Sequence, residues 1–95
     1  MFIVLLKFSD NNAQAAQSMD AHNEWIERGF EDGVFLLVGS LQPQMGGGIM
    51  AHNTTRSELQ NRVDEDPLVA QNVVSAEIIE MAAGKADERL SFLLG

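Results

Sequence analysis

The chain contains no cysteine. That absence excludes disulfide bonds, thiolate nucleophiles and zinc sites built on cysteine. Basic residues are scarce too, because six lysines and arginines stand against fourteen aspartates and glutamates, for a formal net charge of −8. Such a charge repels phosphate groups and acidic lipid surfaces. We therefore expect no nucleic acid and no membrane among the partners of this protein.

A long hydrophobic run is also missing. The apolar stretch at residues 1–6 has no basic segment before it and is too short for a signal peptide or a membrane span. Three glycines follow one another at residues 46–48, but they lack the spacing of a dinucleotide-binding or phosphate-binding loop. We therefore expect a cytoplasmic protein that uses no organic cofactor.

The residues that are present are typical of a folded globular protein, with 45% hydrophobic and 21% charged residues. Ninety-five residues leave room for one hydrophobic core, so we expect a single domain over residues 1–95. Short apolar runs bounded by turn residues predict strands at residues 2–8, 34–39, 48–52 and 73–81.

Two helices are expected between these strands. The first can be capped by Asn11 or Asn12 and runs to about Arg28. The second opens at Thr55, where Glu58 completes a capping box. The order βαββαβ is the split βαβ pattern of a ferredoxin-like α+β fold, a four-stranded antiparallel sheet with two helices on one face.

Two helices leave the other face of such a sheet uncovered, and the strands do not alternate cleanly between apolar and polar residues. In the first strand Ile3 and Leu5 point away from the other apolar side chains. In the second we expect Phe35 and Leu37 to oppose residues 34, 36 and 38. Burying each such side chain is worth roughly 1.5–3 kcal/mol. We therefore expect a homodimer that packs through its sheet faces, with the apolar tail at residues 90–94 clasping the partner.

One face of the first helix carries the main candidate for chemistry. Its apolar stripe, at helical spacing, is formed by Ala15, Met19, His22, Ile26 and Phe30, with Trp25 at its border. An imidazole on such a stripe needs a hydrogen-bond partner. A lone histidine there is more often a structural residue than a catalyst, so both interpretations of His22 stay open.

Asp66 is the carboxylate that the fold can bring to His22, because it follows the second helix. A carboxylate beside the ring would fix its tautomer and suit it to acid–base chemistry near neutral pH. Asp66 also precedes Pro67, an arrangement typical of a helix cap. Both roles can hold together, because a cap uses one carboxylate oxygen and leaves the second free.

Four further residues are candidates for substrate binding: Trp25, Ser40, Gly47 and Gly48. Each has a simpler explanation. Trp25 can be a core residue instead of a pocket wall, and Ser40 lacks the motif of a nucleophile elbow. The glycines at residues 46–48 favour a flexible hairpin loop. The two histidines, His22 and His52, have no ligand pattern around them, so we expect no metal site.

Taken together, these residues and their order resemble the YciI-like (YCII-related) family along almost the whole chain. The shared features are the N-terminal strand, His22 followed by Trp25, Gly33, Gly39, the glycine pair before the third strand, and Asp66-Pro67. The resemblance implies a dimeric α/β barrel like those of muconolactone isomerase and small cofactor-free monooxygenases. It also implies that His22 and Asp66 are the catalytic pair. The sequence departs from the family pattern at Met19, Ser40 and Leu68, which stand where a basic residue, a proline and an aromatic residue are usual.

Most members of that family have no assigned reaction, so the sequence leaves open whether this chain is an enzyme. The leading hypothesis is a cofactor-independent isomerase or lyase-like enzyme. In it His22, oriented by Asp66, transfers protons on a small organic substrate. The alternative is a non-catalytic module that binds a small metabolite.

Overall fold

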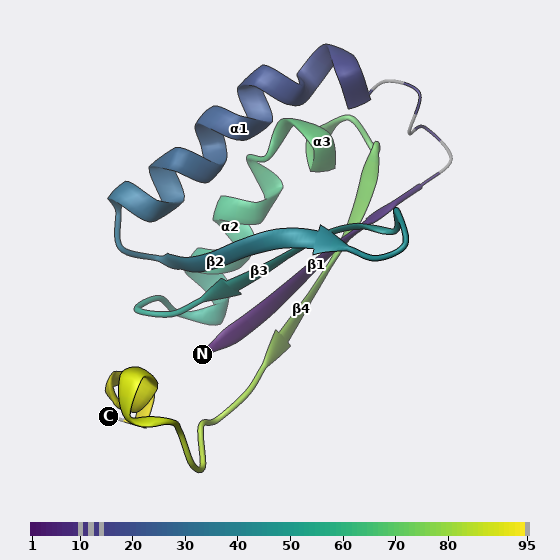
Figure 1. The fold of residues 1–95 in the computed structure, drawn as a ribbon. Coiled ribbons are helices and arrows are strands. Elements are labelled where there is room, and N and C mark those ends of the chain that lie inside the picture. Colours follow the sequence, from purple (N-terminus) through teal and green to yellow (C-terminus); the bar gives the residue numbers. More distant parts are fainter. Residues whose placement is uncertain (10, 12, 14, 95) are drawn as a thin grey trace.

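The protein is a two-layer α+β structure in which a four-stranded antiparallel sheet carries its α-helices on one face (Figure 1). The computed structural model describes residues 1–9, 11, 13 and 15–94. The strands are β1 (Phe2–Phe8), β2 (Phe35–Leu41), β3 (Gly46–Ala51) and β4 (Val74–Glu80). The helices are α1 (Ala15–Glu31), α2 (Arg56–Asp64), α3 (Pro67–Ala70) and the 3-10 helix η2 (Glu88–Leu94).

The strand order β2-β3-β1-β4 places the first and last strands of the chain side by side. Every neighbouring pair is antiparallel, with β1 between β3 and β4. This topology confirms the predicted ferredoxin-like fold. The hydrophobic core lies between the sheet and the helices, where alternate residues of β1 (Phe2, Val4 and Leu6) are all buried.

Strand β2 departs from the expected alternation because it contains a bulge. Phe35 pairs with Ala51 and Leu37 pairs with the preceding residue, Met50, so one extra residue of β2 is accommodated between them. As a result Phe35 and Val38 both pack into the core on the helix side. The prediction that residues 34, 36 and 38 lie together opposite Phe35 was therefore wrong.

The buried face of α1 is also rotated from the expected stripe. Met19 and Phe30 are 41% and 44% exposed, whereas Trp25 is fully buried at the centre of the face. Gly29 lets the helix approach β2 closely, because a Cβ at this position would lie 2.1 Å from Cδ2 of Phe35. Because of this close approach, α1 packs on the sheet through Trp25 and Gly29, and the side chains of Met19 and Phe30 lie at the edges of the contact.

A second glycine, Gly33, terminates α1. Gly33 has a φ of 74°, a left-handed conformation that glycine adopts without strain. Its N–H donates to the carbonyl of Phe30, and the N–H of Val34 donates to that of Gly29. This is the Schellman pattern of a helix end. The predicted cap at the other end involves Asn12, which lies outside the described residues, and Asn11, whose side chain donates to the carbonyl of Gln71.

The two caps predicted for the second helical region are confirmed. Thr55 caps α2 by accepting from the N–H of Glu58 at 3.1 Å. Asp66 caps the single turn of α3 by accepting from the N–H of Leu68 at 3.2 Å, with Pro67 in the first helical position. These caps set the path of the chain from α2 into α3, and that path places Asp66 under α1.

The face of the sheet that points away from the helices is rich in apolar side chains. Ile3, Leu5 and Met50 are only half-buried on it, and Leu37 is 58% exposed. Beyond β4 the chain leaves the sheet and runs to η2 (Figure 1). There the Phe92 ring lies 5.6 Å from that of His52. None of the helices in the described part of the chain has the length and apolar character needed to cross a bilayer.

Candidate functional site

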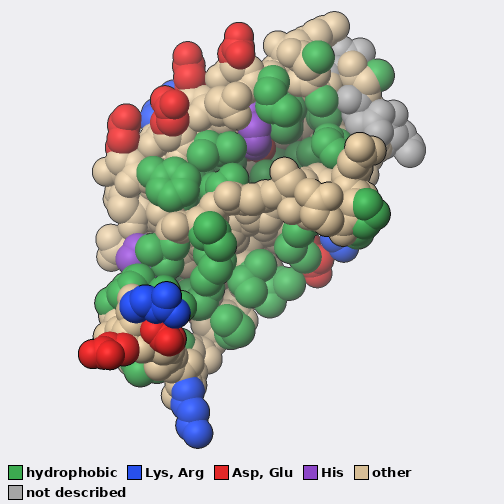
Figure 2. All heavy atoms as spheres, viewed as in Figure 1, with side chains coloured by type: hydrophobic (Ala, Val, Ile, Leu, Met, Phe, Trp, Pro, Cys, Tyr) green, Lys and Arg blue, Asp and Glu red, His purple; other side chains and the backbone are tan. Residues whose placement is uncertain are grey.

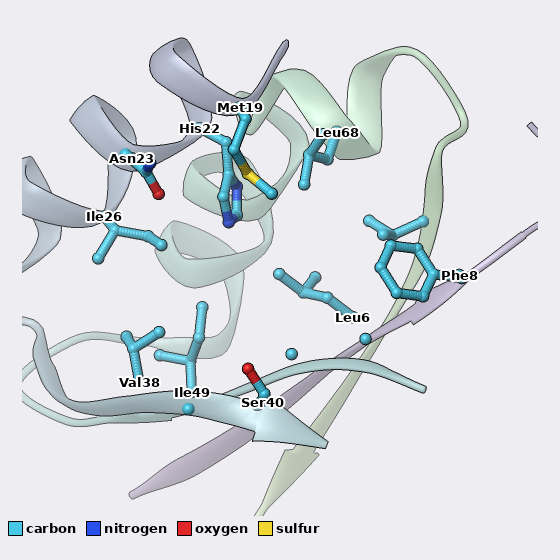
Figure 3. Close-up of a pocket in the computed structure, with 15 residues that line it drawn as sticks. Leu6, Phe8, Met19, His22, Asn23, Ile26, Val38, Ser40, Ile49 and Leu68 are labelled. Carbon is cyan, nitrogen blue, oxygen red and sulfur yellow. The ribbon is translucent and has the colours of Figure 1, made fainter. Parts of the chain in front are cut away.

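A cavity of about 370 Å³ lies between α1 and the end of the sheet formed by β2 and β3 (Figures 2 and 3). Its walls combine apolar side chains, three polar side chains and a strip of glycine backbone. The lining residues are Leu6, Phe8, Met19, His22, Asn23, Ile26, Val38, Gly39, Ser40, Gly46, Gly47, Gly48, Ile49, Leu68 and Val74. Its volume is in the range that binds small organic ligands.

The space exists because β3 carries no side chains at this end. Gly47 pairs with Leu6 on one side and with Ser40 on the other, so it lies in the middle of a row that points toward α1. The glycines at residues 46–48 thus belong to an interior strand, and the expectation of a flexible hairpin loop was wrong. The turn between β2 and β3 is confined to residues 42–45.

The glycines at the start of β3 differ in their steric requirements. Gly46 has a φ of 132°, and a Cβ there would lie 1.9 Å from the carbonyl oxygen of Leu6. Gly47 has no such restriction, since the nearest atom to its Cβ position would be the carbonyl oxygen of Gly39 at 3.5 Å. Gly46 is therefore required by the fold, whereas residue 47 has room for a side chain, which would project into the cavity.

His22 reaches the cavity from the wall formed by α1 (Figure 3). Its Nδ1 atom lies 2.7 Å from Oδ1 of Asp66, and its side chain is 12% exposed. An ionised carboxylate can only accept, so Nδ1 then carries the proton and Nε2 presents a lone pair. A ring nitrogen held in this state can accept a proton from a neighbouring group.

Asp66 contacts His22 on the side away from the cavity. Its own side chain is fully buried and does not line the cavity. One oxygen, Oδ1, accepts both from His22 and from the N–H of Leu68. The other oxygen, Oδ2, is buried without a hydrogen-bond partner among the described residues. The cap and the histidine contact therefore share one oxygen, where a division between the two was expected.

Trp25 packs against a face of the histidine ring, whereas Asp66 contacts its edge. Its indole is stacked on His22, with ring centroids 5.8 Å apart and planes at 27°, and it meets Phe35 edge-on at 5.1 Å. The indole N–H donates to the carbonyl of Arg62 at 2.9 Å, which fixes the orientation of the ring. Trp25 lies behind the cavity wall and is not part of its lining.

The structure thus brings most of the candidate residues to one place. His22, Ser40, Gly47 and Gly48 line the cavity. The polar side chain that sequence reasoning missed is Asn23, whose amide lies on the same wall as His22 (Figure 3). Its position next to His22 in the chain was the available signal, but the helical stripe assigned to the buried face did not include it.

The same glycine strip borders a second hollow on the opposite face of the sheet. This hollow has a volume of about 230 Å³ and includes Leu5, Leu37 and Met50 in its walls. Gly39 and Gly48 line both hollows. No cluster of three or more metal-ligating side chains (His, Cys, Asp or Glu) occurs within the described residues.

Comparison of the chain with known proteins gives three findings. No curated protein matches the chain significantly. Among solved structures, 5-chloro-2-hydroxyhydroquinone dehydrochlorinase (TftG) from Burkholderia phenoliruptrix AC1100, in complex with 2,5-dihydroxybenzoquinone, superposes with a TM-score of 0.69. The match covers 88% of this chain and 96% of the dehydrochlorinase at 11% identity, so it shows a shared fold. The family model for the YCII-related domain matches residues 1–82. The chain therefore belongs to the YCII-related family.

Proposed function

We propose that the protein is a cofactor-independent enzyme that transfers protons on a small, cyclic or conjugated organic substrate, as in an isomerisation or an elimination. In this reaction His22 Nε2 removes or returns a proton at the substrate. Asp66 is the positioning residue that keeps the proton of the free ring on Nδ1. The observation that carries the proposal is the 2.7 Å contact between these two side chains at the wall of a cavity.

Three features of the site support this chemistry. Trp25 and Asp66 hold the ring from two sides, so little orientation has to be gained when a substrate binds. The aliphatic walls lower the local polarity and strengthen electrostatic interactions with a reacting group. The similar solved structure is named as a dehydrochlorinase and contains a quinone, which makes elimination on an oxygenated ring the first reaction to test.

The test compares the wild-type protein with His22→Gln and His22→Ala. The first substrate is 5-chloro-2-hydroxyhydroquinone, followed by other hydroxylated rings. Proton transfer is measured by ultraviolet absorbance and by deuterium incorporation in heavy water. Both variants should lose at least ~10²-fold in turnover, the usual contribution of a general acid or base. If they only lower the melting temperature and still bind the ring, the protein is a binding module and the enzyme proposal fails.

We also propose that the protein works as a homodimer joined through its open sheet faces, as in an α/β barrel. The support is the apolar side chains on that face, among them Leu37, which a monomer leaves in water. Light scattering at micromolar concentration should report a dimer. Leu37→Glu should give a folded monomer, and Ala21→Glu, on the exposed side of α1, should leave the dimer intact. A monomeric wild-type protein would refute this assembly.

A further inference from the structure

The charge of the cavity walls carries information about the ligand. Three polar side chains line the cavity: His22, Asn23 and Ser40. No lysine or arginine is among the described lining residues, and the position one helical turn before His22 holds the thioether Met19. With Asp66 ionised, the His22–Asp66 pair carries at most zero net charge in either state of the ring. The cavity walls therefore carry no lysine or arginine charge to balance an anionic group, and the charge of a protonated His22 ring is already balanced by Asp66.

The surroundings of the cavity add negative charge. Helix α1 carries four exposed carboxylates and a single basic residue: Asp20, Glu24, Glu27, Glu31 and Arg28. Figure 2 shows acidic side chains along the outer edge of this helix. The formal net charge of −8 acts in the same direction. A carboxylate or phosphate approaching the cavity meets repulsion outside and apolar walls inside, and burying an unpaired charge there is costly.

The polar groups of the cavity lie on two opposite walls. His22 and Asn23 project from α1, and Ser40 projects from β2 across the cavity (Figure 3). Between them lie apolar side chains such as Leu6 and Ile49. A flat ring would contact these apolar walls while its two ends reach hydrogen-bonding groups. Small-molecule sites usually combine apolar walls with a few such polar groups that fix the orientation of the ligand.

We propose that the cavity selects an uncharged ring with a hydrogen-bonding oxygen at each end and rejects anionic rings of the same shape. His22 and Asn23 bind one end, and the Ser40 hydroxyl binds the other. The selection rests on the proposed function only in using the same cavity, because it concerns which ligand is bound and not whether it reacts.

The test uses two ligands of nearly identical shape, 4-hydroxybenzamide and 4-hydroxybenzoate. Trp25 is the single tryptophan of the chain and is stacked on His22, so its fluorescence reports binding without any turnover. The wild-type protein should bind the amide at least ~10-fold more tightly than the carboxylate. Raising the salt concentration should narrow this ratio, because screening weakens the repulsion at the rim.

Three variants complete the test. Met19→Arg should remove the preference or reverse it by supplying a cation at the rim, and Met19→Leu, the matched control, should keep it. Ser40→Ala should weaken binding of the amide by at least ~3-fold through the loss of one hydrogen bond.

Equal or tighter binding of 4-hydroxybenzoate to the wild-type protein overturns the proposal, as does no binding of either ring at millimolar concentration. Failure of the enzyme proposal looks different, because the amide then binds with the expected preference while His22→Gln leaves turnover unchanged.

Discussion

Replacing Asp66 by asparagine or by alanine separates the two tasks of its carboxylate. Asparagine caps helices as well as aspartate does, so Asp66→Asn should keep the contact to the N–H of Leu68. The charge-assisted hydrogen bond from His22 becomes a neutral one, at a cost of about 1 kcal/mol. Asp66→Ala loses the cap, worth about 1 kcal/mol. It also leaves Nδ1 of His22 without its partner, at about 1–3 kcal/mol.

The two variants should therefore differ in their free energy of unfolding by about 2 kcal/mol. For a domain of this size that difference corresponds to roughly 8–16 °C in melting temperature. Thermal and urea unfolding at one fixed protein concentration measure it, since assembly makes the melting temperature depend on concentration. Equal destabilisation by both variants would show that Asp66 does not act as a cap and a histidine partner in the way described.

Activity and stability should separate in the asparagine variant. An amide can donate to Nδ1 as well as accept from it, so the proton of the His22 ring is free to move to Nε2. A ring in that tautomer has no lone pair facing the cavity. Turnover of Asp66→Asn should fall by ~10²-fold or more, and ¹⁵N chemical shifts of the ring should report the mixed tautomers. Wild-type turnover in this variant would refute the positioning role of Asp66.

Two glycine substitutions test the packing around the site. Gly29→Ala places a methyl group 2.1 Å from the Phe35 ring and should cost ~1–3 kcal/mol in urea unfolding. Gly84→Ala, with nothing within 4 Å of its Cβ position, is the control and should change little. Gly47→Ala should fold normally yet weaken ligand binding, measured by tryptophan fluorescence, because its methyl group enters the cavity. Gly46→Ala should destabilise the fold itself, and equal stability of these last two variants would contradict the steric assignment.

The fold was predictable because several local signals agree with one another. The βαββαβ order specifies the topology, and the caps at Thr55 and at Asp66-Pro67 each specify an element boundary; the structure keeps all three. Of the predicted capping box only the Thr55 half forms, because the Glu58 side chain accepts from the Thr55 hydroxyl. The inward row of β1 was predictable from its period of two. A sequence in which independent local preferences point to one topology leaves few alternatives.

The details of the site were harder to predict, for two physical reasons. Glycine is unfavourable in strands, so three in a row at residues 46–48 indicate a loop unless the need for a cavity is known. The bulge at Phe35 and the close approach at Gly29 are tertiary effects that change which side chains face the core. Helical periodicity alone placed Met19 in the core, whereas in the rotated helix it lies at the rim of the cavity.

The two hollows that share Gly39 and Gly48 couple the ligand cavity to the outer face of the sheet. At these positions a bare peptide layer is all that separates one side of the sheet from the other. The cavity at His22 and the outer sheet face that we propose for dimerisation are thus separated only by backbone at these two positions. A bulky residue introduced at Gly48, which pairs with Leu5 in the row facing away from α1, would fill the second hollow, where its Cβ would lie 3.3 Å from the Leu41 side chain.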